Sequence, residues 1–135
     1  MAASEAVYTK YRDVINFIMI DTIEAYPVGS ACPYNGEQTT VESSYTVAGE
    51  FGMPIQQPKT YEERVKQAID FKTTLSITIP MLVDEMDNAV WCTYGPASNI
   101  AYLIDTNGTI VIKQPYYVPE EMETAIVKYL QGNSK

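Results

Sequence analysis

The sequence predicts a mixed α/β fold, a sheet with flanking helices that ends in a β-hairpin followed by a helix. Residues 14–22 are nearly all apolar or β-branched, which is typical of a strand buried on both faces of a parallel sheet. Thr60 and Glu63 have the spacing of a capping box, which predicts a helix to about Thr73. Asn107-Gly108 lies between two apolar runs and predicts a tight hairpin turn, because both residues tolerate positive φ.

The remaining elements follow from local patterns. Residues 4–12 predict a short first helix, and Pro119 at a first-turn position begins a last helix that Gly132 ends. The predicted order is helix, strand, long loop, helix, three strands and helix. The three later strands are predicted at residues 79–84, 100–105 and 109–112. The last helix is expected to face inward with Met122, Ile126, Tyr129 and Leu130, and the middle helix with Val65, Ala68, Ile69 and Lys72.

A long irregular loop occupies residues 23–59. Proline and glycine punctuate it throughout and no hydrophobic period is sustained, although a short hairpin at residues 39–46 fits the pattern. Its aromatic residues predict that it packs on the domain. The length of 135 residues suits one domain, so the sequence predicts a single domain over residues 1–135.

Composition limits the classes of function. The net charge of -8 and the absence of a basic cluster argue against a nucleic acid or an anionic membrane as partner. The sequence contains no secretory signal pattern and no apolar run long enough to span a membrane, which predicts a cytoplasmic protein. Because the chain has no histidine, acid–base chemistry near neutral pH would require carboxylates or tyrosines with shifted pKa values.

Several short motifs together resemble the redoxin branch of the thioredoxin superfamily, and within it the iodothyronine deiodinase family and its bacterial relatives. The resemblance covers nearly the whole chain and implies a thioredoxin-like sheet. The motifs are residues 9–11 (TKY), 23–25 (IEA), 62–65 (EERV), 80–88 (PMLVDEMDN), 94–95 (YG), 101–105 (AYLID) and 108–110 (GTI).

The resemblance implies that the family's catalytic residues are missing. The family nucleophile lies on a strand before the first helix, and this sequence is expected to begin inside that helix, which predicts a truncated sheet. Tyr26 and Pro58 stand where the family has histidines. The family's active-site proline is expected near Ser98 but is displaced to Pro96, and Ile100 replaces the arginine that follows it. These departures favour a retained fold that has lost its chemistry.

Five residues are candidates for lining a polar pocket at the end of the sheet, where α/β proteins bind ligands. The alternative is that they cap loops and pack with their polar ends in water. The acidic group Asp84, Glu85 and Asp87 lacks the spacing of a calcium loop, so no metal and no cofactor is expected. The pocket candidates are Glu24, Tyr26, Asp84, Tyr94 and Ser98.

Two functions of different class are therefore open. The first is a non-catalytic module that binds a small molecule or a protein at the former active-site end of the sheet. The second is a weak thiol oxidoreductase that uses Cys32 and Cys92, although two unrelated free thiols are the simpler interpretation. The missing central strand also predicts either direct pairing of its neighbours, or repair by residues 39–46, or a homodimer through an exposed or exchanged strand. Of these three, the homodimer is favoured.

Overall fold

The computed structural model describes residues 2–24, 56–95 and 99–132 of the chain. The chain divides into two compact units, Asn16–Pro96 and Met1–Ile15 with Ala97–Lys135, and each is described by itself. Each unit combines helices with a two-stranded sheet, so the predicted mixed α/β class is confirmed. The single domain over residues 1–135 stays a prediction, and residues 39–46 lie outside the described residues.

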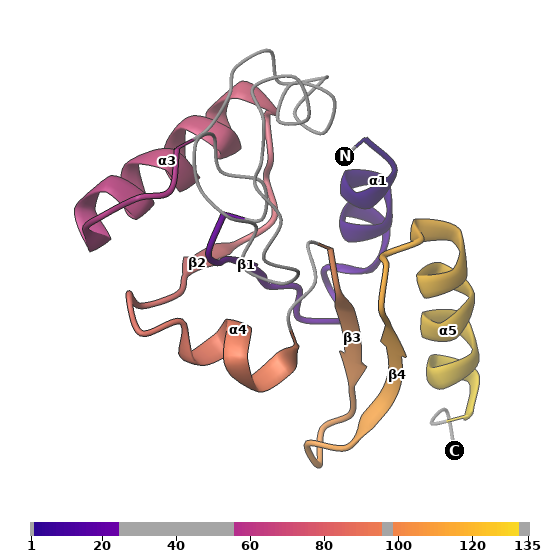
Figure 1. Cartoon of the computed structure of the whole chain (residues 1–135). Helices are drawn as coiled ribbons and strands as arrows, with labels where there is room; N and C mark the ends of the chain where they lie inside the picture. The colour runs from indigo at the N-terminus through magenta and orange to yellow at the C-terminus, as the bar shows by residue number, and fades with distance from the viewer. Residues whose placement is uncertain (1, 25–55, 96–98, 133–135) are drawn as a thin grey trace. The chain divides into compact units, whose positions relative to one another are not determined.

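The unit Asn16–Pro96 is built on a parallel pair of strands (Figure 1). Its elements in chain order are β1 (Met19–Asp21), α3 (Tyr61–Thr74), β2 (Met81–Val83) and α4 (Ala89–Tyr94). Helix α3 packs against β2, and α4 follows β2 in the chain. The parallel pairing aligns Ile20 with Leu82, so the carboxyl ends of both strands lie at the same end of the sheet.

The start of α3 confirms the capping-box prediction with one difference. The Thr60 hydroxyl accepts the N–H of Glu63 at 3.2 Å, and Thr60 has the extended backbone of an N-cap residue. In a capping box the glutamate accepts the N–H of the cap residue itself, but here Glu63 accepts the N–H of Lys59 at 2.7 Å. The predicted inward face is wrong in part, because Ile69 is exposed while Arg64 is buried beside Ala68.

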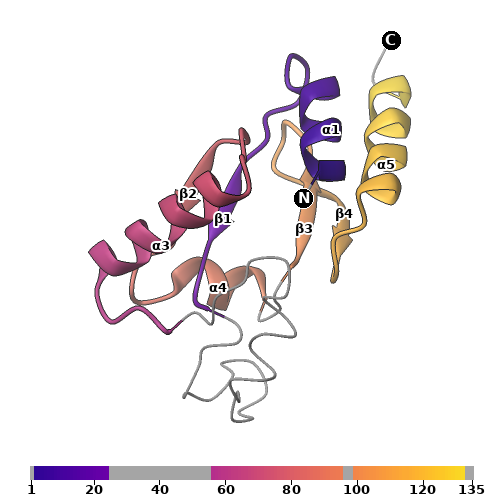
Figure 2. The same ribbon diagram turned by 90° about the horizontal axis from the view of Figure 1, so that it is seen from above.

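The second unit pairs an antiparallel hairpin with two helices. Its elements are α1 (Ala2–Tyr11), β3 (Ala101–Ile104), β4 (Ile110–Gln114) and α5 (Pro119–Gly132). Helices α1 and α5 lie side by side (Figure 2) and bury Val7, Tyr11, Met122 and Ile126. Lys10 and the Tyr11 hydroxyl both donate to the carboxylate of Glu123, which joins the two helices at their polar edge.

The turn of the hairpin differs from the predicted type. Among the described residues only Ser76 and Asn88 are non-glycine residues with positive φ, so Asn107 does not adopt it, whereas Gly108 does at 84°. The Asp105 carboxylate accepts the N–H of Asn107 and of Thr109, and the Asp105 carbonyl accepts the N–H of Gly108. The turn is therefore built around Asp105 with a left-handed glycine, a longer connection than a two-residue turn.

The predicted strand at residues 14–22 is mostly not a strand. The N–H groups of Val14 and Ile15 donate to the carbonyl of Tyr11, which extends α1 into a turn. Extended backbone begins only beyond this turn, and β1 is three residues long. Ile20 is exposed in β1, so the prediction of a strand buried on both faces is wrong.

The described strands form two separate two-stranded sheets, β1 with β2 and β3 with β4. The short helix α4 was not predicted, because six residues are too few for a hydrophobic period to show. In the described part of the chain, no helix has the length and apolar character needed to cross a membrane.

Candidate functional site at the ends of the parallel strands

The carboxyl ends of β1 and β2 are joined by a backbone hydrogen bond. Asp21 ends β1, Asp84 follows β2, and the N–H of Asp84 donates to the carbonyl of Asp21 at 2.8 Å. The carboxyl ends of parallel strands are the usual place for ligands in α/β proteins. Of the predicted pocket residues, Asp84 directly follows β2, and Glu24 lies three residues after the end of β1.

Asp84 is buried at 3% exposure, and its carboxylate accepts hydrogen bonds from the start of α4. One carboxylate oxygen accepts the N–H of Val90 at 3.1 Å and the other accepts the N–H of Trp91 at 3.0 Å. These N–H groups lie in the first turn of α4, where no carbonyl of the helix itself can accept them. Asp84 therefore fixes the start of α4, and both of its oxygens already have partners.

Arg64 on α3 is hydrogen-bonded to the loop between β2 and α4. Its side chain is 1% exposed, and one terminal nitrogen donates to the carbonyls of Asp84 at 3.1 Å and Glu85 at 2.7 Å. The other terminal nitrogen donates to the side-chain oxygen of Asn88 at 2.8 Å. Asn88 has a left-handed backbone, and the hydrogen bond that Arg64 donates to the side-chain amide of Asn88 supports this conformation. The guanidinium acts as a rigid fork that ties three loop residues to α3.

Asp21 is the titratable group of this site. Burial, together with the negative charge of Glu24, raises the pKa of the Asp21 carboxyl to about 6, although the Arg64 guanidinium opposes both effects. The backbone of Glu24 is fixed by Gln57, whose amide accepts the Glu24 N–H and donates to the Glu24 carbonyl. The strand ends thus present a half-buried carboxyl that titrates close to neutral pH.

The other predicted site residues fall on α4 or outside the described residues. Cys92 is a free, exposed thiol on α4, and Tyr94 is the exposed last residue of that helix. Hydrogen bonds from Val90 and Trp91 tie this helix to Asp84, which connects it to the strand ends. The predicted candidates Tyr26, Cys32 and Ser98 lie outside the described residues.

Asp21 and Arg64 are the two site residues that sequence reasoning missed. Asp21 interrupts an apolar run at its carboxyl end, and that position is a signal for a site residue in an α/β sheet. Arg64 lies four residues before Ala68 on one helix face, so a charged residue on the buried face was visible in the sequence. Neither signal identifies the loop that Arg64 holds.

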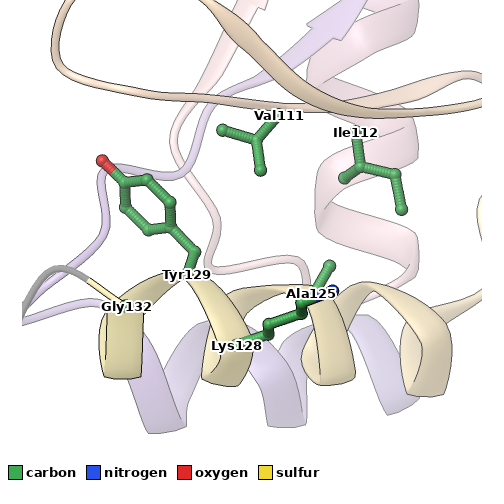
Figure 3. A pocket seen from close by; sticks show the side chains of 6 residues that line it. All are labelled: Val111, Ile112, Ala125, Lys128, Tyr129 and Gly132. Carbon is green, nitrogen blue, oxygen red and sulfur yellow. The ribbon is translucent and has the colours of Figure 1, made fainter.

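A separate hollow of about 440 Å³ lies between β4 and α5 (Figure 3). Figure 3 shows Val111 and Ile112 of the strand on one side and Tyr129 of the helix on the other. Of the described residues that line it, Lys128 is the only charged one. Because polar groups do not converge on it, this hollow lacks the fixed polar contacts that orient a ligand.

Among the described residues no group of three or more Cys, Asp or Glu side chains is placed to hold a metal ion. No protein-family model, no curated protein and no solved structure matches the chain. The structure therefore defines the chain as a mixed α/β protein.

Proposed function

We propose that the chain is a non-catalytic binding module with a thioredoxin-like architecture, and that its ligand binds at the carboxyl ends of β1 and β2. The observation that carries the proposal is the half-buried Asp21 carboxyl, whose pKa is raised to about 6. Keeping a charge in this place at neutral pH costs folding stability, and such groups concentrate at functional sites. Next to it, Arg64 fixes the β2–α4 loop and Asp84 fixes the start of α4 through hydrogen bonds.

The architecture is supported by the two sheets. In a thioredoxin-like sheet one central strand lies between the counterparts of β1 and β3, and these strands pair here with β2 and β4 respectively. A parallel pair followed by a hairpin and a helix agrees with the strand order on either side of that central strand. An exposed free thiol at Cys92 suits a reducing compartment, which favours the cytoplasm as the place of action.

The binding proposal can be tested by mapping amide shifts in the ¹⁵N-labelled chain. A library of small amines, carboxylates and short peptides is titrated, and we expect ligand-dependent shifts at Asp21, Glu24 and Asn88. Asp21→Asn should weaken these shifts, whereas Glu62→Gln, on the exposed start of α3, should leave them unchanged. Ligands that shift only the residues of α1 and α5 would contradict the proposal.

A weak thiol oxidoreductase is the second candidate, and the exposed Cys92 thiol favours it. It is tested by deiodination and disulfide-reduction assays, in which the binding-module proposal expects no turnover. Turnover that disappears in Cys92→Ser would establish the thiol enzyme instead. Turnover that persists when both Cys32 and Cys92 are serine would contradict both candidates.

A further inference from the structure

Among the described strands, β1 pairs with β2 along one of its two edges. The N–H of Met19 donates to the carbonyl of Pro80, and the carbonyl of Asp21 accepts the N–H of Asp84, so these two residues direct their backbone groups toward β2. Successive residues of a strand direct their N–H and C=O groups to opposite edges. The backbone groups of Ile18, Ile20 and Thr22 therefore point to the other edge, where no described strand pairs with them.

This free edge is also apolar. On this edge Ile18 is 60% exposed and Ile20 is 39% exposed, and Leu82 of the neighbouring strand β2 is 55% exposed. Ile20 and Leu82 are register partners across the parallel pair, so they lie next to each other on one face of the sheet. Natural edge strands usually carry lysine, proline or a bulge that prevents pairing with another chain, and residues 18–22 contain none of these. The edge is suited to accept an added strand.

The chemistry of an added strand follows from the two faces of β1. On one face its side chains would lie beside Ile20, which favours apolar residues. On the opposite face they would lie beside Asp21, and the chain carries a net charge of -8, which favours lysine or arginine. A second copy of the chain brings another net charge of -8 and a second Asp21, so charge disfavours it as the occupant.

We propose that the free edge of β1 binds an extended peptide segment of a partner protein, in which apolar and basic residues alternate. The segment adds to the sheet as a strand through Ile18, Ile20 and Thr22, and its basic residues pair with Asp21. This mode of binding takes affinity from the backbone and specificity from alternate side chains. The inference rests on the proposed function and names the class of partner that the strand ends recognise.

The test uses the ¹⁵N-labelled full chain and the synthetic peptide acetyl-Thr-Val-Lys-Val-Lys-Val-Thr-amide. We expect saturable shifts of the Ile18, Ile20 and Thr22 amides and slower hydrogen exchange at these three positions. Two matched peptides carry N-methyl groups either on the valine amides or on the lysine amides. Only alternate amides of an added strand face β1, so one N-methylated peptide should lose binding and the other should keep it.

Charge is tested with a third peptide, in which glutamate replaces lysine. This peptide should bind at least about tenfold more weakly than the lysine peptide. On the side of the protein, Ile18→Lys places a charge at the edge and should weaken binding of the lysine peptide. Asp21→Asn should weaken the lysine peptide about threefold, as expected for the loss of one partly exposed charge pair. The peptide controls do not depend on the folding of any variant.

Three results would overturn the proposal. The first is equal binding of both N-methylated peptides, and the second is no shift at Ile18, Ile20 and Thr22. The third is a free chain that light scattering shows to be a dimer with these amides already protected, since a second copy would then occupy the edge. If this peptide fails while other ligands shift Asp21, Glu24 and Asn88, only the peptide inference is lost and the binding module stands.

Discussion

Asp21 links the candidate site to folding stability through its pKa. The folded-state value of about 6 lies above the ordinary value of 3.8. The stability contributed by the protonated carboxyl is therefore complete below pH 3.8 and is lost as the pH rises through about 6. We expect Asp21→Asn to raise the free energy of unfolding by about 1–3 kcal/mol at neutral pH and to change it little near pH 4.

Urea denaturation of both proteins across this pH range measures the effect. The difference between wild type and variant isolates Asp21 from other carboxyls, such as Glu123, whose pKa is lowered by its hydrogen bond with Lys10. Asp70→Asn, at an exposed position of α3 where Asp70 pairs with Lys66, serves as the control and should not stabilise the chain at neutral pH. A stability difference of the same size at pH 4 and pH 7 would contradict the raised pKa.

Arg64 is expected to be among the most sensitive positions of the unit Asn16–Pro96. Lysine keeps the charge but cannot reproduce the fork that reaches Asp84, Glu85 and Asn88. Arg64→Lys leaves buried acceptors without donors, which we expect to lower the free energy of unfolding by about 2–4 kcal/mol. Chemical denaturation checks this, with the exposed Lys66→Arg on the same helix as control. A loss no larger than that of the control would show that the loop does not depend on Arg64.

At the scale of elements, the start of α3 depends on one hydroxyl. Thr60→Ala removes the acceptor of the Glu63 N–H and should cost about 1 kcal/mol of stability. Thr60→Ser keeps the hydroxyl and should retain most of the stability. Thermal and urea denaturation of the three proteins measure the difference. Equal losses in the alanine and serine variants would mean that the methyl group, and not the hydroxyl, matters at Thr60.

The elements also show where sequence patterns succeed. Helices α3 and α5 begin as predicted because capping hydroxyls and first-turn prolines act within a few residues. The strand predicted at residues 14–22 is shortened because the N–H groups of Val14 and Ile15 donate to the carbonyl of Tyr11 at the end of α1. Helix α4 is missed because its start depends on Asp84, whose role is visible only from its hydrogen bonds to Val90 and Trp91.

For the whole molecule, the homodimer expected from the sequence stays a prediction. The association of two copies should depend on the salt concentration. Each copy carries a net charge of -8, so two copies repel each other at low ionic strength. We expect a monomer at low ionic strength, and any self-association of the chain to strengthen toward about 1 M salt, where charge is screened within a few ångströms. Light scattering over a range of concentrations measures this. A dimer that weakens as salt is added would show that opposite charges, and not strand edges, hold it together.

The sequence by itself determines the mixed α/β class, the starts of α3 and α5, the hairpin, and Glu24 and Asp84 at the strand ends. These features rest on interactions between residues close in the chain, which a sequence pattern records directly. The tertiary structure alone decides that Arg64 supports the β2–α4 loop, that burial raises the pKa of Asp21, and that β1 pairs with β2. Burial and strand pairing depend on contacts between distant segments, and no local pattern contains them.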